Sequence, residues 1–394
     1  MLYACLQSKG DGTRILANAT YPSKQGDGLI YDSSESDLRF SDLREDMPLK
    51  VRGFYAVVGF KAEHVLLSRD VIGGYPLYYS RTEFSSFSRM INPVESGESV
   101  NRVNPGEVVK VYYDGRIEKL SYSFDEVFKP DPSPKDEGEV EVLLEVVERK
   151  LKDFGQGDCI SFSGGVDSSL LAAMYDLPLV SVTASEKEEE HVKRAAKEIG
   201  REIYIFRFGE EDVREVIPEV LRAVEEPNPF HVSIGIPVYL SMVKAKELGF
   251  ESVIFGQGAD ELFGGYKKYE NYRGEELFWV LKKDVEMLGV NNLERDVKLS
   301  YRAGVRILTP YLQWDIVEAV MKIPGEYKVR EVGGEIIRKY ALRKIAEKYL
   351  PESIAYRQKK AVQYSTKTST ILEKIAKKEG MSVKEYLEKI YSSL

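Results

Sequence analysis

A largely apolar run that meets a glycine turn and then a helix constrains the fold of this chain most. Residues Cys159–Phe162 read as a strand, Ser163-Gly164-Gly165 as the turn, and a helical pattern begins at Ser168. Strand, turn and helix in this order point free backbone N–H groups at an anion. Paired glycines let the backbone approach a phosphate closely. The pattern predicts a phosphate-binding loop, and the alternative is an ordinary turn with a small-residue helix cap.

Polar side chains of the loop add to this prediction. Ser163, Ser168 and Ser169 carry hydroxyl donors, and Asp167 can hold a magnesium ion that bridges phosphate oxygens. The loop is not a Walker A loop, because no Gly-Lys-Ser/Thr follows at the required spacing. The string Ser-Gly-Gly-Val-Asp-Ser-Ser resembles the pyrophosphate loop of the ATP pyrophosphatase class, which cleaves ATP between its α- and β-phosphates. The resemblance implies ATP and Mg²⁺ as cofactors.

Composition and charge narrow the classes of protein that this chain can be. Its 394 residues predict about two to three domains, and the net charge of −8 argues against bulk binding to nucleic acid or to an anionic membrane. No apolar run is long enough to span a bilayer and no signal peptide is recognisable, so we expect a cytoplasmic protein. The two cysteines make no disulfide framework, and the three histidines show no metal-ligand spacing.

The sequence pattern changes at a proline-rich segment. Residues 1–128 alternate with a period of two and include a strong hairpin turn at Asp114-Gly115, which predicts an antiparallel sheet domain. Residues 129–138 carry three prolines within five residues, which prevent a helix and predict an extended linker. Residues 139–394 form the second predicted domain.

The second domain alternates strand and helix patterns. A helical pattern covers 139–154, and strand patterns recur at 159–162, 179–183, 202–206 and 252–255. This alternation predicts an α/β fold with a doubly wound parallel sheet, which binds its ligands at the carboxyl ends of the strands. From about residue 275 to 394 the pattern is mostly helical.

A second glycine-rich turn follows the strand pattern at 252–255. Residues 256–266 read Gly-Gln-Gly-Ala-Asp-Glu-Leu-Phe-Gly-Gly-Tyr and include Asp260. If both glycine loops lie at one edge of the sheet, Asp167 and Asp260 can converge on one magnesium ion, because two carboxylates and phosphate oxygens make an ordinary magnesium shell. The alternative is a glycine-rich loop with solvated acids. The stretch resembles the synthetase-domain signature of the asparagine synthetase B family.

Further segments resemble that family in the same order along the chain. They are 69–79 (Arg-Asp-Val-Ile-Gly-Gly-Tyr-Pro-Leu-Tyr-Tyr), 309–312 (Thr-Pro-Tyr-Leu), 339–343 (Lys-Tyr-Ala-Leu-Arg) and 356–360 (Tyr-Arg-Gln-Lys-Lys). The resemblance implies a truncated, Ntn-hydrolase-like glutaminase domain of β-rich antiparallel structure, followed by a synthetase domain with a helical carboxyl-terminal part.

The resemblance also implies an adenylation reaction. A substrate carboxylate attacks the α-phosphate of ATP, pyrophosphate leaves from the first glycine loop, and ammonia or an amine then attacks the acyl-adenylate to give an amide. A lysine and a metal ion act where charge develops in such a reaction. The implied residues are Ser163, Gly164, Gly165, Asp167, Ser168, Ser169, Val182, Phe255 and Gly256 for ATP, Asp167 and Asp260 for magnesium, and Lys359, Gln257 and Asp260 for catalysis.

The amino terminus departs from the family pattern. Family glutaminases use a cysteine that is exposed by removal of Met1, and Leu2 stands at that position here. Cys5 lies nearby, and we interpret it as a core residue of the first strand. We therefore expect no glutamine hydrolysis.

The acceptor half of the implied site departs as well. Gln257 replaces a family glutamate and cannot carry charge, and Arg306 and Gln313 replace two family acids. The residues implied for ATP are intact, whereas the altered acceptor half leaves the identity of the carboxylate open.

Three interpretations remain. The first is an amide ligase that resembles asparagine synthetase and activates aspartate or another small carboxylate for attack by ammonia or an amine. The second is an adenylating ligase on a different substrate, such as a peptide. The third is a non-catalytic ATP-binding protein, which the intact phosphate loop disfavours because an idle site need not keep phosphate ligands. The sequence leaves the oligomeric state open, a homo-oligomer included.

Overall fold

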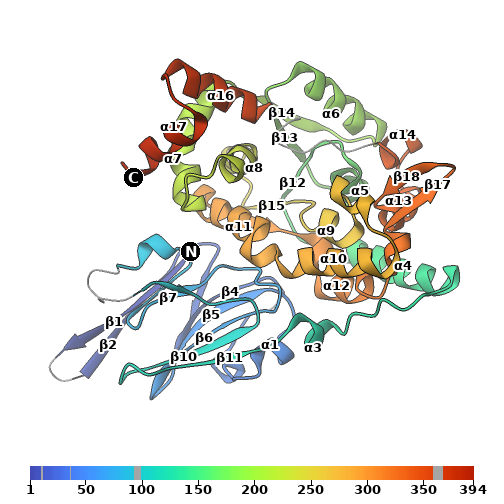
Figure 1. Cartoon of the computed structure of the whole chain (residues 1–394). Helices are drawn as coiled ribbons and strands as arrows, with labels where there is room; N and C mark the ends of the chain where they lie inside the picture. Colours follow the sequence, from blue (N-terminus) through green and yellow to red (C-terminus); the bar gives the residue numbers. More distant parts are fainter. Residues whose placement is uncertain (10–11, 36, 93–98, 358–366) are drawn as a thin grey trace. The chain divides into compact units, whose positions relative to one another are not determined.

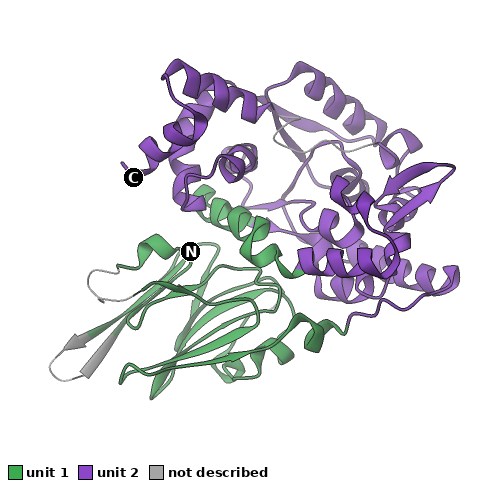
Figure 2. Ribbon diagram, in the orientation of Figure 1, with its two compact units in different colours: residues 1–129, 286–306 green, residues 130–285, 307–394 purple. Residues whose placement is uncertain are grey.

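The chain forms two compact units. The computed structural model describes residues 1–9, 12–35, 37–92, 99–357 and 367–394 (Figure 1). Unit 1 contains residues 1–129 and 286–306, and unit 2 contains residues 130–285 and 307–394 (Figure 2). The segment 286–306 therefore packs with the amino-terminal residues although most of unit 2 precedes it in the sequence. The domain limits placed at 128 and 139 stay predictions.

Unit 1 is built on two antiparallel sheets, as the period of two predicts. Their orders are β2-β1-β8-β7-β9 and β11-β10-β6-β5-β4-β3. The first sheet contains β1 (Leu2–Lys9), β2 (Gly12–Ala19), β7 (Tyr78–Tyr79), β8 (Glu83–Ser85) and β9 (Asn101–Arg102). The second contains β3 (Lys24–Gly26), β4 (Leu29–Ser33), β5 (Tyr55–Phe60), β6 (His64–Arg69), β10 (Glu107–Tyr112) and β11 (Ile117–Ser121). Its α-helices are α1 (Met47–Lys50), α3 (Phe124–Phe128) and α11 (Asn292–Ala303).

Strand β5 lies in the core of unit 1. Tyr55 and Val57 belong to one hydrophobic cluster with Met47 of α1. The intervening Ala56 and Val58 are also fully buried, so both faces of the strand are covered. This explains why β5 reads as a continuous apolar run rather than as an alternation.

The Arg69-Asp70 motif braces unit 1. The Asp70 carboxylate accepts hydrogen bonds from the backbone N–H groups of Tyr55, Ile72, Gly73 and Gly74 at 2.7–3.0 Å. The fully buried Arg69 guanidinium donates to the carbonyl oxygens of Val103, Gly73 and Gly289 at 2.7, 2.8 and 3.0 Å. Because Gly289 lies in the segment 286–306, these bonds hold that segment in unit 1.

Unit 2 contains the doubly wound parallel sheet. Its order is β14-β13-β12-β15-β16, and the pairs that β12 makes with β13 and β15 are parallel. The strands are β12 (Cys159–Ser161), β13 (Leu179–Thr183), β14 (Ile203–Arg207), β15 (Ser252–Ile254) and β16 (Arg306–Leu308). A separate hairpin consists of β17 (Val329–Val332) and β18 (Glu335–Arg338). The sequence predicted the first four strands of the sheet and took the later part of the chain as helical, so β16 and the hairpin correct that expectation.

Helices surround this sheet. The chain runs from β12 through α5 to β13 and through α6 to β14, and it returns through α7 and α8 to β15. The helices are α4 (Glu137–Lys152), α5 (Val166–Met174), α6 (Glu186–Glu198), α7 (Glu210–Val224), α8 (Pro229–Glu247), α9 (Ala259–Phe263), α10 (Gly274–Glu286), α12 (Trp314–Val320), α13 (Tyr340–Ala346), α14 (Glu352–Ala355), α16 (Thr368–Lys378) and α17 (Val383–Tyr391). Within the described residues, no helix combines the length and apolar character that crossing a membrane requires.

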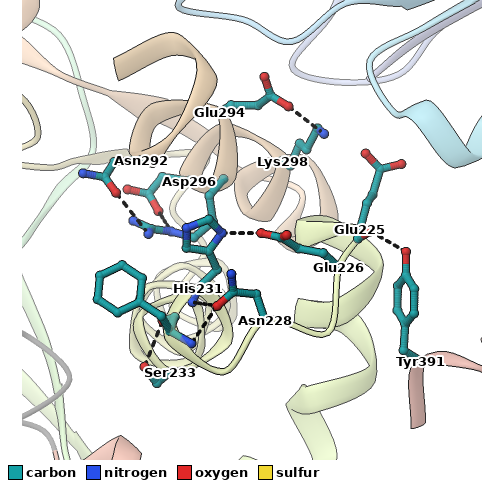
Figure 3. Close-up of polar contacts among 12 residues, drawn as sticks. Glu225, Glu226, Asn228, His231, Ser233, Asn292, Glu294, Asp296, Lys298 and Tyr391 are labelled. Atoms are coloured by element: carbon teal, nitrogen blue, oxygen red, sulfur yellow. Dashed lines mark hydrogen bonds and ion pairs between the residues drawn. The ribbon is translucent and has the colours of Figure 1, made fainter. Parts of the chain in front are cut away.

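Helix α8 begins at a polar cap (Figure 3). The Asn228 side-chain oxygen accepts from the backbone N–H groups of Phe230 and His231 at 3.0 and 3.4 Å. Pro229 occupies the first turn, where its fixed φ suits a helix start and its missing N–H costs nothing. The His231 ring contacts the Glu226 carboxylate. The cap thus fixes where the longest helix of unit 2 starts.

A buried lysine next to the hairpin lowers the stability of unit 2. Lys328 is fully buried, and its ammonium lies 5.2 Å from the centre of the Phe278 ring with no hydrogen-bond partner in the part of the chain that the structure describes. Burial lowers the pKa of Lys328 to about 7. The unfolded chain keeps an ordinary lysine pKa, so it binds a proton that the folded chain releases, and stability rises with pH from about 7 to about 10.

We therefore expect Lys328→Met to stabilise the protein by about 2 kcal/mol or more at pH 7, with a smaller gain at pH 9. Urea unfolding at both pH values measures this. Lys322→Met, which changes a partly exposed lysine paired with Glu318, serves as the matched control and should shift stability by less than about 0.5 kcal/mol. A Lys328→Met protein that is less stable than the unchanged protein at pH 7 would contradict the assignment.

Candidate functional site

Two glycine turns meet at the carboxyl ends of β12 and β15. Strand β12 has β13 on one side and β15 on the other, so the strand order reverses there. Doubly wound sheets bind ligands at this switch point. A Cβ atom on Gly256, just after β15, would lie 3.0 Å from the Cβ atom of Asp167, which lies at the start of α5 directly after the turn that follows β12. The structure thus brings the two loops together at one sheet edge, which the sequence pattern predicted.

The first loop is shaped by its own side chains. The Ser168 hydroxyl accepts from the Ser163 backbone N–H at 3.2 Å and donates to the Gly165 carbonyl at 3.3 Å. Gly164 has a φ of +66°, in the left-handed region that glycine tolerates best. Ser163 is exposed at the mouth of the loop, whereas Ser169 is fully buried and its hydroxyl has no hydrogen-bond partner among the described residues. The Ser163 hydroxyl is thus accessible to a ligand, and the assignment of Ser168 and Ser169 to ATP stays a prediction.

A single lysine bridges the two predicted metal ligands. The Lys339 ammonium lies 2.6 Å from both Asp167 carboxylate oxygens and 2.7 Å from the Asp260 Oδ1 atom. The exposed fractions of these side chains are 2% for Lys339, 10% for Asp167 and 12% for Asp260. Asp167 and Asp260 therefore converge, and a positive charge already lies between them.

The backbone conformation at Lys339 positions its side chain between the two carboxylates. Lys339 joins β18 to α13 with a φ of 58°, an uncommon left-handed conformation for a residue with a side chain. Such backbone outliers concentrate at functional sites. A Cβ atom on Gly265 would lie 1.8 Å from Asp260 Oδ1 and 2.3 Å from Lys339 Cε, so only glycine fits there. The sequence alone indicates no role for Lys339, because the left-handed φ that places its side chain cannot be predicted from the flanking residues.

The two carboxylates suit a magnesium ion. Within the described residues, no group of three or more His, Cys, Asp and Glu side chains is placed to hold a metal. Magnesium is commonly held by one or two carboxylates together with substrate phosphates and water. Asp167 and Asp260 meet that requirement, and the two carboxylates carry one more formal charge than the single Lys339 ammonium balances. The donor set fits Mg²⁺ in the presence of a phosphate ligand.

The other predicted site residues take several positions. Val182 lies in β13, and Phe255, Gly256 and Gln257 follow β15; all four are half-buried at the same sheet edge as the loops. Lys359 lies outside the described residues. The assignment of these residues to ATP or to catalysis stays a prediction.

The positions at which the chain departs from the family pattern lie in different structural environments. The Gln313 amide donates to the carbonyl oxygens of Lys150 and Pro310, both at 3.0 Å, so it braces the backbone. Arg306 begins β16. In unit 1, Leu2 is fully buried in β1, and Cys5 lies in the same strand but is only half-buried. Cys159 is fully buried, and burial raises the pKa of its thiol to about 12.

Comparison with known proteins gives a family. The Asparagine synthase family model matches residues 141–282 and 273–389. A Methanocaldococcus jannaschii relative that carries an asparagine synthetase name is 31% identical over 85% of this chain and 72% of its own length. A Lotus japonicus asparagine synthetase is 30% identical over 54% of this chain and 40% of its own length, so the chain spans less than half of that plant relative.

A solved structure, a glutamine phosphoribosylpyrophosphate amidotransferase from B. subtilis, matches at 10% identity over 52% of this chain and 59% of its own, with a TM-score of 0.22. A likeness this weak carries no argument. The family model, by contrast, matches the part of the chain that contains the two glycine loops and Lys339, and the archaeal relative matches 85% of the chain. The chain therefore belongs to the asparagine synthase family.

Proposed function

We propose that this protein is an ATP-dependent, AMP-forming amide ligase that activates a small carboxylate, aspartate or another, by adenylation. The observation that carries the proposal is the pair of largely buried carboxylates, Asp167 and Asp260, which both contact the Lys339 ammonium beside a glycine-rich loop. Such an arrangement binds a cation and a polyphosphate together. Family membership supports the reaction class.

In the first step a carboxylate oxygen of the substrate attacks the α-phosphorus of ATP. The bond between that phosphorus and the bridging oxygen breaks, and pyrophosphate leaves with the electron pair. The loop at 163–165 binds the pyrophosphate through backbone N–H groups. Asp167 and Asp260 would hold magnesium, which supplies positive charge to the phosphate oxygens when bound. Lys339 then has phosphate oxygens as a second set of partners and neutralises charge on the leaving group.

In the second step the nitrogen of ammonia or an amine attacks the acyl carbon of the adenylate. The carbon–oxygen bond to AMP breaks, AMP leaves with the electron pair, and the nitrogen loses a proton as the amide forms. Gln257, half-buried beside the loop, can orient either reactant by hydrogen bonds but cannot take up this proton. The proton therefore leaves to another base or to water.

We expect no release of glutamate when the protein is incubated with glutamine, ATP and magnesium. The position that carries the nucleophile in family glutaminases holds Leu2, which is fully buried and apolar. The measurement is a glutamate assay with and without glutamine, next to amide formation with ammonium chloride. Glutamate release that disappears in a Cys5→Ala variant would contradict the expectation, because Cys5 would then be a nucleophile.

The experiment that tests the proposed function follows nucleotide products with a panel of small carboxylates and ammonium chloride. We expect AMP and pyrophosphate in equal amounts with at least one carboxylate, together with its amide. ADP and phosphate as products would overturn the AMP-forming reaction. No carboxylate-dependent cleavage of ATP across the panel would overturn the proposal and favour a non-catalytic ATP-binding protein.

A further inference from the structure

A histidine of α6 packs against the phosphate loop. The His191 Nε2 atom lies 3.1 Å from the Gly164 carbonyl oxygen, and the His191 residue is 8% exposed. The fit is tight, because a Cβ atom on Gly164 would lie only 2.5 Å from that nitrogen. His191 comes from the helix that follows β13, so a second strand–helix connection supports the loop after β12.

The direction of the hydrogen bond is fixed by its partners. A carbonyl oxygen only accepts, so His191 Nε2 carries the hydrogen. Burial lowers the pKa of His191 to about 4, and the nearby Arg357 and Arg194 guanidiniums add to the effect. The ring is therefore neutral near pH 7, with the hydrogen on Nε2. Arg357 donates to the same Gly164 carbonyl at a longer distance of 3.4 Å.

This bond sets the direction of the next peptide group. In a trans peptide the C=O and N–H bonds point in opposite directions, so a Gly164 carbonyl held toward α6 turns the Gly165 N–H away from α6. That N–H donates to the Ser163 hydroxyl at 3.4 Å, a distance near the limit of a hydrogen bond. A phosphate oxygen is a stronger acceptor and can replace the hydroxyl as its partner.

We propose that His191 is a positioning residue of the phosphate loop, which holds the Gly164 carbonyl so that the Gly165 N–H faces bound pyrophosphate. This inference rests on the proposed function and adds a residue that lies outside the two glycine loops and the other segments that carry the family resemblance. His191 touches the loop and not the reacting atoms, so it acts on the affinity for the phosphates.

The test measures binding of magnesium pyrophosphate by calorimetry and the kinetic constants for ATP in the full chain. His191→Phe fills the space of the imidazole ring without a hydrogen-bond donor. We expect the Kd for magnesium pyrophosphate and the KM for ATP each to rise roughly tenfold. The kcat should stay within about threefold of that of the unchanged protein. His191→Gln places an amide donor near the position of Nε2 and should restore both constants to within about threefold. His231→Phe, at a histidine that contacts Glu226, is the matched control and should leave both constants unchanged.

Thermal unfolding of each variant separates an effect of His191 on the stability of the fold from an effect on the position of the phosphate loop. If His191→Phe lowers the melting temperature but binds pyrophosphate like the unchanged protein, the histidine is structural and the inference is wrong. Equal weakening by His191→Phe and His191→Gln, with both folded, also overturns it, because a donor would then not matter. If the unchanged protein binds no pyrophosphate, the proposed function itself fails, and this inference fails with it.

Discussion

Asp260→Asn is expected to reduce carboxylate-dependent AMP formation by about 10²- to 10³-fold. The change keeps the shape of the side chain but removes one of the two negative charges that face the Lys339 ammonium. Magnesium would then have a single carboxylate, Asp167, and the metal ion would bind more weakly beside the phosphates. Initial rates at saturating ATP and at several magnesium concentrations measure the loss, and part of it should be recovered at high magnesium.

The matched control for this variant is Asp176→Asn. Asp176 also lies in unit 2, its side chain is fully exposed, and it pairs with Arg201 rather than with any residue of the two loops. We expect its rate to stay within about twofold of the unchanged protein, because exposed ion pairs contribute little. If Asp260→Asn is as active as Asp176→Asn, the carboxylate pair has no part in the reaction.

Lys339→Met should have two separate effects. It leaves the buried Asp167 and Asp260 carboxylates without their shared cation, and breaking a buried ion pair costs about 3–5 kcal/mol of stability. It also removes the charge that we assign to the departing pyrophosphate, so AMP formation should fall by about 10²-fold or more. Two like charges left together attract a divalent cation, so magnesium should raise the melting temperature of the variant more than that of the unchanged protein.

Lys344→Met is the control for this second variant. Lys344 belongs to α13, the helix that begins just after Lys339, and its partly exposed ammonium pairs with Glu347 at 3.2 Å. The stability of Lys344→Met should differ from that of the unchanged protein by less than about 0.5 kcal/mol. Magnesium should raise the melting temperature of this variant no more than that of the unchanged protein. A Lys339→Met protein with normal stability and no added response to magnesium would show that the lysine does not occupy a cation site.

Elements with strong local patterns could be predicted from the sequence. The glycine turn after β12, the hairpin turn between β10 and β11, and the strands β12, β13, β14 and β15 all lie where the patterns indicated. These elements are specified by residues that are neighbours in the chain, either through a period of two or 3.6 or through turn chemistry. Asp167 and Asp260 followed from the same logic, because the ends of adjacent parallel strands must meet.

What the sequence did not predict depends on contacts between distant residues. Strand β16 begins with Arg306, and the hairpin strands β17 and β18 each include charged residues, so they lack the largely apolar run that marks the equally short β12 and β15. Lys339 reaches the carboxylates because that hairpin ends in a left-handed residue. The place of 286–306 in unit 1 depends on hydrogen bonds such as that from Arg69 to the Gly289 carbonyl, which joins residues 220 positions apart.

Carboxylate-dependent exchange of labelled pyrophosphate into ATP tests the central claim most directly. The reaction needs the reversible formation of an acyl-adenylate and no nitrogen donor, so it isolates the step that we assign to the phosphate loop, Asp167, Asp260 and Lys339. We predict that label enters ATP when magnesium and a suitable small carboxylate are present, and that exchange falls sharply in Asp260→Asn. Exchange that stays at background with a broad panel of carboxylates, in a protein that binds ATP, would contradict the account.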